Sequence, residues 1–176
     1  MTEIATAISQ RARELRQAFD HTFAAPVHLD TTIKVDLLGI AVGGRNCALR
    51  LSDIAGLFAG KKITRVPGGG AALRGIAGFR GSVLPVYDLE VLLGHPSART
   101  APWLIVASAA PVALAFEAFV GQLRVKANEI VPQASRQEMA TFARELVRTE
   151  SFIGPILHLP SVLETITGSG AGGTSK

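Results

Sequence analysis

The stretch GIAGFRGSVLPVYDL, residues 75–89, decides the fold. Its glycines permit sharp bends or close approach to another backbone, and its valines and leucines supply the apolar mass typical of strands. An arginine, Arg80, interrupts this pattern between Phe79 and Gly81. We therefore predict that Arg80 lies at a turn rather than in the middle of a strand, and the purpose of its guanidinium becomes the main functional question.

Similar short apolar runs flank this stretch. LLGIAV and CALRL, joined by GGRN, predict a hairpin before it. The following segment, LSDIAGLFA, fits either a short helical turn capped by Ser52 or a strand after a bend. LEVLLG predicts a short helix that ends at Gly94. We expect Asp88 to cap this helix instead of working with Glu90 as a general acid and base, because aspartate is favoured at that position.

The second half of the chain repeats this order weakly. Apolar runs at 103–107 and 112–116 are separated by a turn, and further strand-like runs follow as far as FIGPILHL. Two similar halves built of short strands predict a pair of small β-barrels. Residues 135–149 keep helical spacing but come just before a turn, so we expect a short helix followed by a strand there.

Both ends of the chain are predicted to lie outside the barrels. Residues 3–23 have the apolar spacing of an amphipathic helix, which defines a helical extension at 1–30. This helix either packs on the body of the protein or binds a partner or a second copy. Residues 169–176, rich in glycine and serine, have the composition of a disordered tail.

The composition restricts the setting in which the protein works. With 176 residues, 48% of them hydrophobic, the chain is long enough for a sizeable core. Its one cysteine, Cys47, fits a reducing compartment, and no secretory signal is evident, so we expect a cytoplasmic protein. The apolar stretch 103–120 contains the turn-like SAAP and is better explained by a buried hairpin than by direct membrane insertion.

No arrangement of residues points to an enzyme, a cofactor or a metal. The glycine-rich segments lack the lysine that phosphate-binding loops need, and the four histidines lack metal-ligand spacing. Cys47 lies in a predicted strand and is expected to be a core residue. The net charge of +4 comes from residues 43–100, where eight lysines and arginines face three acids. We infer a binding module, with a basic nucleic-acid-binding barrel as the alternative; its weak point is the single Tyr and single Trp.

At residues 73–94, LRGIAGFRGSVLPVYDLEVLLG resembles the signature of CheW-like domains, the coupling proteins of bacterial chemosensory arrays. Segments on both sides are similar to the opening strands and the second half of that family, so the resemblance covers about residues 35–166. It implies a mostly β fold of two small five-stranded SH3-like barrels packed together, without enzymatic activity. We assign the domain to residues 31–168, with a first barrel at about 35–100 and a second at about 101–166.

The resemblance also implies partners. One surface of such a domain meets the CheW-like regulatory domain of a CheA-type histidine kinase, and a groove receives the helical hairpin at the cytoplasmic tip of a methyl-accepting chemoreceptor. Arg80 falls where the family has its receptor-linked arginine, and Ile54 falls at an apolar position near the same groove. We expect Leu57 and Phe79 to contribute to this partner-binding site.

Three features leave alternatives open. Two of them are departures from the family's pattern. Shortly after the apolar position at Ile54, the family has an acidic residue where this chain has Gly56, and in the last strands the family's Asp-Leu pair is replaced by His158-Leu159. The guanidinium of Arg80 has two possible roles: it faces a partner at the rim of the groove, or it fixes the hairpin by bonding to a turn carbonyl or to Asp88.

Overall fold

The structure is a computed structural model that describes residues 33–68, 70–97, 100–133 and 141–169. The helical extension predicted at 1–30, the helix predicted early in 135–149 and nearly all of the predicted tail lie outside these residues. Eleven strands account for most of the described chain: β1 (Lys34–Val42), β2 (Arg45–Arg50), β3 (Ile54–Ala59), β4 (Leu73–Phe79), β5 (Ser82–Asp88), β6 (Trp103–Ala107), β7 (Ala113–Phe116), β8 (Ala118–Lys126), β9 (Ile130–Pro132), β10 (Ala143–Arg148) and β11 (Ile153–Leu157).

Four short helices join or follow these strands. The 3-10 turns are η1 (Leu51–Asp53) and η2 (Ala127–Glu129), and the α-helices are α2 (Leu89–Leu92) and α3 (Leu159–Ser169). The segment left open in the sequence therefore combines both alternatives: η1 is a single helical turn, without a side-chain cap, and β3 follows it directly. The short helix predicted after Asp88 is confirmed as α2.

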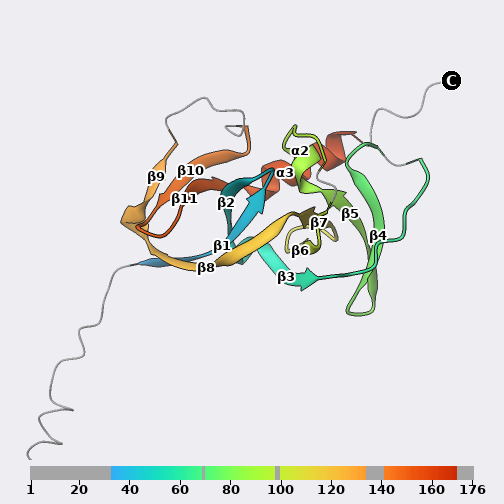
Figure 1. The fold of residues 1–176 in the computed structure, drawn as a ribbon, viewed down its shortest axis with the longest axis horizontal. Helices are drawn as coiled ribbons and strands as arrows, with labels where there is room; N and C mark the ends of the chain where they lie inside the picture. Colours follow the sequence, from blue (N-terminus) through green and yellow to red (C-terminus); the bar gives the residue numbers. More distant parts are fainter. Residues whose placement is uncertain (1–32, 69, 98–99, 134–140, 170–176) are drawn as a thin grey trace, which may run out of the picture. The chain divides into compact units, whose positions relative to one another are not determined.

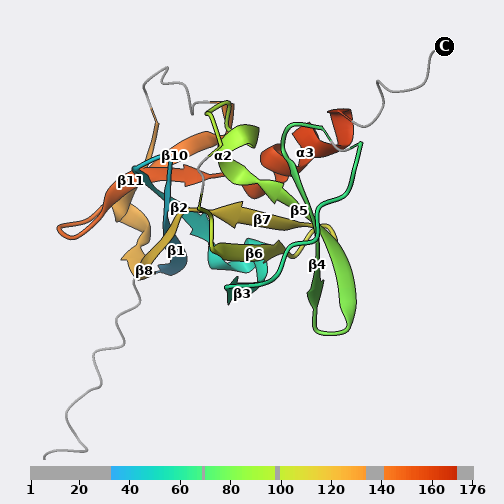
Figure 2. The ribbon, with the colours of Figure 1, turned by 45° about the vertical axis from the view of Figure 1, so that its right-hand side comes forward.

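The strands form two sheets, as the predicted β fold requires (Figures 1 and 2). Sheet A has the order β8-β1-β2-β11-β10-β9, and sheet B has the order β3-β6-β7-β5-β4. The prediction of five strands in each barrel thus matches sheet B and differs from sheet A, which has six. The extra strand is β9, which follows η2 and pairs with β10 along Ile130–Pro132.

Each sheet combines strands from both halves of the chain. Sheet B contains β3, β4 and β5 together with the β6–β7 hairpin, while sheet A contains the β1–β2 hairpin together with β8 to β11. The parallel pairs β5–β7 and β2–β11 join these contributions. The strand order therefore differs from the predicted barrels at about 35–100 and 101–166. The physical reason is that the chain crosses between sheets twice, at η1 after β2 and at Glu117 between β7 and β8.

A shared hydrophobic core links the two sheets. One cluster of buried side chains draws on β1, β2 and β11 of sheet A, on β6 and β7 of sheet B, and on both α-helices. Burial of apolar surface contributes about 25 cal/mol per Å², so the sheets stabilise each other and are not independent barrels. Its fully buried members include Ile40, Leu49, Ile105, Leu114, Phe116, Leu157, Leu89 and Val162.

Helices α2 and α3 lie side by side and each follows a hairpin, β4–β5 or β10–β11 (Figures 1 and 2). Leu89 in α2 and Leu159 in α3 are both buried in the shared core. Among the residues that the structure describes, no helix has the length and apolar character needed to cross a membrane.

Sheet B curls so that its two edges meet. After β3, Thr64 pairs with Ile76 of β4, with two backbone N–H···O distances of 2.8 Å. The neighbouring Gly75 has a φ of 141°, and a Cβ atom at this position would overlap the Thr64 carbonyl oxygen. Only glycine permits this approach of two backbones. The glycines of the deciding stretch therefore serve closure of the sheet as well as bending of the chain.

Candidate functional site

The turn between β4 and β5 projects beyond the neighbouring strands and carries Arg80 (Figures 1 and 2). Because Phe79 pairs with Ser82, the loop consists of Arg80 and Gly81 alone, with φ values of 46° and 88°. Positive φ at both loop positions is typical of a type I′ hairpin turn, which favours asparagine and glycine. A larger side chain in this region costs of order 1 kcal/mol. The predicted turn is confirmed, and its arginine is kept against a backbone preference.

Arg80 lies over an aromatic ring that also contacts a second ring and a lysine. Its guanidinium carbon is 5.9 Å from the ring centre of Phe58 on β3. The Phe58 and Phe79 rings meet edge to face with centres 5.0 Å apart, and the ammonium of Lys61 lies 5.4 Å and 6.0 Å from the two centres. Cations near aromatic ring faces are held by the ring quadrupole. We call Phe58, Lys61, Phe79 and Arg80 the cation–aromatic cluster.

The described residues offer no structural bond that explains Arg80. Its side chain is exposed, and within the described chain it makes neither a hydrogen bond nor an ion pair. The alternative that Arg80 pairs with Asp88 is wrong, because the carboxylate of Asp88 lies 3.8 Å from Arg74 instead. Arg74 is on β4 and comes closest to Asp88 because the antiparallel register places the start of β4 beside the end of β5.

The four residues predicted to bind partners fall into two sets. Ile54 and Leu57 are half-buried on β3 and pack against the shared core between the sheets. Phe79 is buried in a separate cluster inside sheet B, against which Phe58 also packs. Successive residues on a strand face opposite sides, so Leu57 and Phe58 point to different faces of β3. Phe79 thus supports Arg80 indirectly, through the Phe58 ring. The register irregularity between Ile54 and Gly56 allows Ile54 to lie with Leu57 on the other face, toward the shared core.

Two cavities are lined in part by residues of η1. One has a volume of about 290 Å³ and the other about 450 Å³. Arg50 lines both and makes a 2.5 Å ion pair with Glu145, reaching across β11 to β10. Asp53, immediately before Ile54, lines the smaller cavity. Neither cavity is lined by the four predicted residues.

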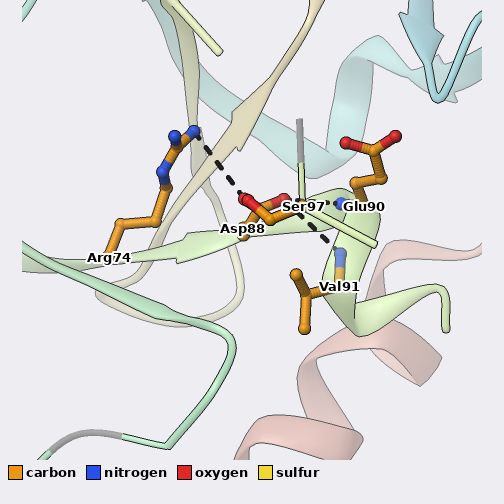
Figure 3. A network of polar contacts seen from close by, with 5 residues as sticks. All are labelled: Arg74, Asp88, Glu90, Val91 and Ser97. Atoms are coloured by element: carbon orange, nitrogen blue, oxygen red, sulfur yellow. Dashed lines mark hydrogen bonds and ion pairs between the residues drawn. The ribbon is translucent and has the colours of Figure 1, made fainter. Parts of the chain in front are cut away.

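Asp88 is held in a structural network (Figure 3). It is 2% exposed, and its Oδ1 accepts hydrogen bonds from the backbone N–H groups of Glu90 at 3.0 Å and Val91 at 3.4 Å. Its other oxygen accepts a 2.5 Å hydrogen bond from the Ser97 hydroxyl and faces Arg74. The predicted helix-capping role of Asp88 is confirmed, and the carboxylate is fully occupied by fixing the end of the hairpin.

Cys47 is a core residue, as predicted. It is fully buried in β2, and burial raises the pKa of its thiol to about 12, since a thiolate is poorly stabilised away from water. A protonated, buried thiol is a poor nucleophile. In the described part of the chain, no three potential metal ligands lie close enough together to bind an ion.

Sequence reasoning missed Phe58 and Lys61. They lie in the segment FAGKK, where an aromatic residue at the end of an edge strand is followed by two lysines. An aromatic residue followed closely by two lysines was the signal in the sequence that could have indicated a cation–aromatic contact. What the sequence did not reveal is that β3 and β4, which are the two edges of sheet B, bring this segment to the Arg80 turn.

The geometry defines a class of protein: a β-rich binding module with a cationic turn, a structural thiol and a structural carboxylate network. The chain belongs to the CheW-like domain family, whose model matches residues 36–167. Members of this family are non-enzymatic scaffolds of chemotaxis signalling.

The fold has a solved relative. The chain is similar to the scaffolding protein TtCheW from Thermoanaerobacter tengcongensis, with a TM-score of 0.64 and 18% sequence identity over 71% of this chain and 89% of that chain. At this identity the similarity concerns the fold. No curated protein matches the sequence.

Proposed function

We propose that this scaffold couples a chemoreceptor to a CheA-type histidine kinase on the cytoplasmic side of a receptor array. The observation that carries the proposal is the Arg80 turn: an exposed guanidinium without a hydrogen bond in the described chain, held at a backbone position that disfavours arginine. Backbone strain that persists at one surface position is typical of a functional constraint. The planar guanidinium is suited to bind carboxylates or helix carbonyls of a partner.

The proposal assigns the two partners to two different surfaces of the domain. We assign the receptor's helical hairpin to edge strand β3 and the neighbouring Arg80 turn, with Phe79 and Arg80 on one side of the strand and Ile54 and Leu57 on the other. The half-buried apolar residues Ile54 and Leu57 supply contact area for an apolar ridge of the hairpin. The kinase's CheW-like regulatory domain is assigned to another face, as the family implies. Each contact is expected to be modest in affinity and to gain from avidity within an array.

The alternative, a basic nucleic-acid-binding barrel, is less well supported. Binding of single strands relies on free aromatic faces for stacking of bases. Tyr87 and Trp103 pack against the shared core, and Trp103 is further covered by Phe119, with ring centres 5.4 Å apart. The positive charge of sheet B is therefore better explained by a protein partner.

Affinity capture from native lysate tests the proposal. Wild-type protein, Arg80→Glu and the control Arg148→Glu serve as baits; Arg148 is an exposed arginine on β10 of sheet A, so the control makes the same charge change elsewhere. We expect the wild type and the control to capture both a histidine kinase and a receptor, and Arg80→Glu to lose the receptor. Failure of the wild type to capture either partner would overturn the coupling role.

A further inference from the structure

The surface of sheet B carries charge of one sign. From residue 54 to residue 116 the only acidic residues are Asp88 and Glu90, and both are buried. Among the residues of this segment that the structure describes, four cationic side chains are exposed. The sheet therefore presents positive groups without a neighbouring surface carboxylate of its own segment. These exposed cations are Lys61, Lys62, Arg65 and Arg80.

Two of these cations are held in place. Lys61 and Arg80 lie over the Phe58 ring, at 5.4 Å and 5.9 Å from its centre. Phe58 is itself fixed by its edge-to-face contact with Phe79. Holding charges in advance reduces the conformational entropy that a partner must overcome on binding. The aromatic contact covers one side of each charged group, and the N–H groups that do not face a ring are left to face solvent or a ligand.

The position of Phe58 also excludes a competing charge. A Cβ atom on Gly56 would lie 2.8 Å from the edge of the Phe58 ring. A side chain at position 56, acidic or otherwise, would thus displace the ring that supports Lys61 and Arg80. The cationic character of this end of sheet B is built into the packing of β3.

We propose that the cation–aromatic cluster is a docking site for an acidic segment of a partner protein, with carboxylates bound between Lys61 and Arg80. The inference rests on the proposed function in that the ligand is a protein. Arginine binds carboxylates in a bidentate fashion, and a lysine nearby adds a second charge-assisted contact. The same site disfavours a partner that presents a lysine or arginine there, since like charges repel without a carboxylate to compensate.

Other anionic ligands fit the cluster less well. A nucleic acid would need exposed ring faces, whereas Phe79 is 4% exposed and Phe58 is covered by two cations. Binding to an anionic membrane is favoured by roughly 1 kcal/mol for each lysine or arginine near its surface. With four exposed cations, the free energy of membrane binding would be marginal. A peptide carboxylate needs neither stacking on a ring nor insertion into a membrane to reach two cations that share one aromatic ring.

Nuclear magnetic resonance titration of the isotope-labelled full chain tests the inference. The probes are a short glutamate-rich helical peptide, its glutamine counterpart, oligothymidine and vesicles that contain phosphatidylserine. We expect saturable shifts at residues 58, 61 and 79–81 with the glutamate peptide alone. Lys61→Met and Arg80→Gln should each weaken this binding about fivefold, and Arg148→Gln should leave it unchanged.

Three results would overturn the inference: equal shifts with the glutamine peptide, tighter binding of oligothymidine or vesicles at the same residues, or unchanged affinity in both cluster variants. Capture of the kinase, measured with the same proteins, distinguishes failure of this inference from failure of the proposed function. If the kinase is captured while the glutamate peptide causes no shifts, the acidic-segment site is wrong and the scaffold role stands. If neither is observed, both are wrong.

Discussion

The guanidinium carbon of Arg80 lies 5.9 Å from the ring centre of Phe58, although the two residues belong to opposite edges of sheet B. This contact depends on closure of the sheet, which the pairing of Thr64 with Ile76 provides. The functional side chain is thus positioned by long-range pairing, while its own turn opposes it through a positive φ of 46°. Substitution of Arg80 is therefore expected to impair partner binding without lowering the stability of the fold.

Replacement of Arg80 by asparagine should keep or raise stability while it abolishes receptor capture. Asparagine tolerates positive φ better than arginine, which favours the variant by up to about 1 kcal/mol, and the lost cation–aromatic contact offsets part of this gain. Urea unfolding followed by Trp103 fluorescence measures the change. A fall in unfolding free energy of more than about 1 kcal/mol would assign Arg80 a structural role instead.

Replacement of Gly75 by alanine should destabilise the protein by about 3 kcal/mol or more. The added methyl group would overlap the Thr64 carbonyl oxygen, and the φ of 141° is unfavourable for alanine. Gly78→Ala is the matched control in the same strand, because nothing lies within 4 Å of its Cβ position. Comparable urea midpoints for the two variants would contradict the closure of sheet B through Thr64.

Replacement of Asp88 by alanine should cost about 2–3 kcal/mol. The change removes two backbone hydrogen bonds at the start of α2 and leaves the partly buried Arg74 without its carboxylate. Asp36→Ala is the control, since Asp36 forms an exposed pair with Arg124 at 3.4 Å and should lose less than about 0.5 kcal/mol. Thermal and urea unfolding of both variants, measured at one pH, checks the difference.

The thiol of Cys47 should make stability fall at alkaline pH. Its pKa is raised to about 12 in the folded chain, against an ordinary value of 9.0. The unfolded state therefore ionises first as pH rises. The stabilisation is fully present below pH 9 and is lost progressively between about pH 9 and pH 12, so that the loss at pH 10 is on the order of 1 kcal/mol.

Urea unfolding of wild type and Cys47→Ala under reducing conditions, compared near pH 8 and pH 10, isolates this contribution. The variant lacks the titrating group, so its stability should change less between the two conditions. The cavity that alanine leaves affects both conditions equally. A parallel loss of stability in both proteins would assign the pH dependence to other groups.

Much of the local structure was predictable from the sequence because it depends on neighbouring residues. The Arg80-Gly81 turn, the α2 helix with its Asp88 cap and the burial of Cys47 were all predicted and confirmed. Each follows from a short-range rule: the conformational range of glycine, the capping preference of aspartate, or an apolar strand around a thiol. The resemblance to CheW-like domains rested on the same local motif and is also confirmed.

The expected division into consecutive barrels failed for a different reason. The half-repeat in the sequence shows which segments are strands, but it does not show which strands pair. The β6–β7 hairpin pairs with strands of the first half, and the β1–β2 hairpin pairs with strands of the second half. The sixth strand of sheet A, β9, lies among the strand-like runs that the sequence showed in the second half, but no local pattern indicated that it pairs with β10 as part of this sheet.

The sequence by itself determined the elements, the turn that presents Arg80 and the family of the protein, because those properties are encoded by residues close together in the chain. The tertiary structure alone decided that Phe58 and Lys61 join Arg80, and that Ile54 and Leu57 lie on the other face of β3. Such placement depends on the closure of sheet B and on the exchange of hairpins between sheets. Both arise from burial of apolar surface among distant segments, which no local pattern specifies.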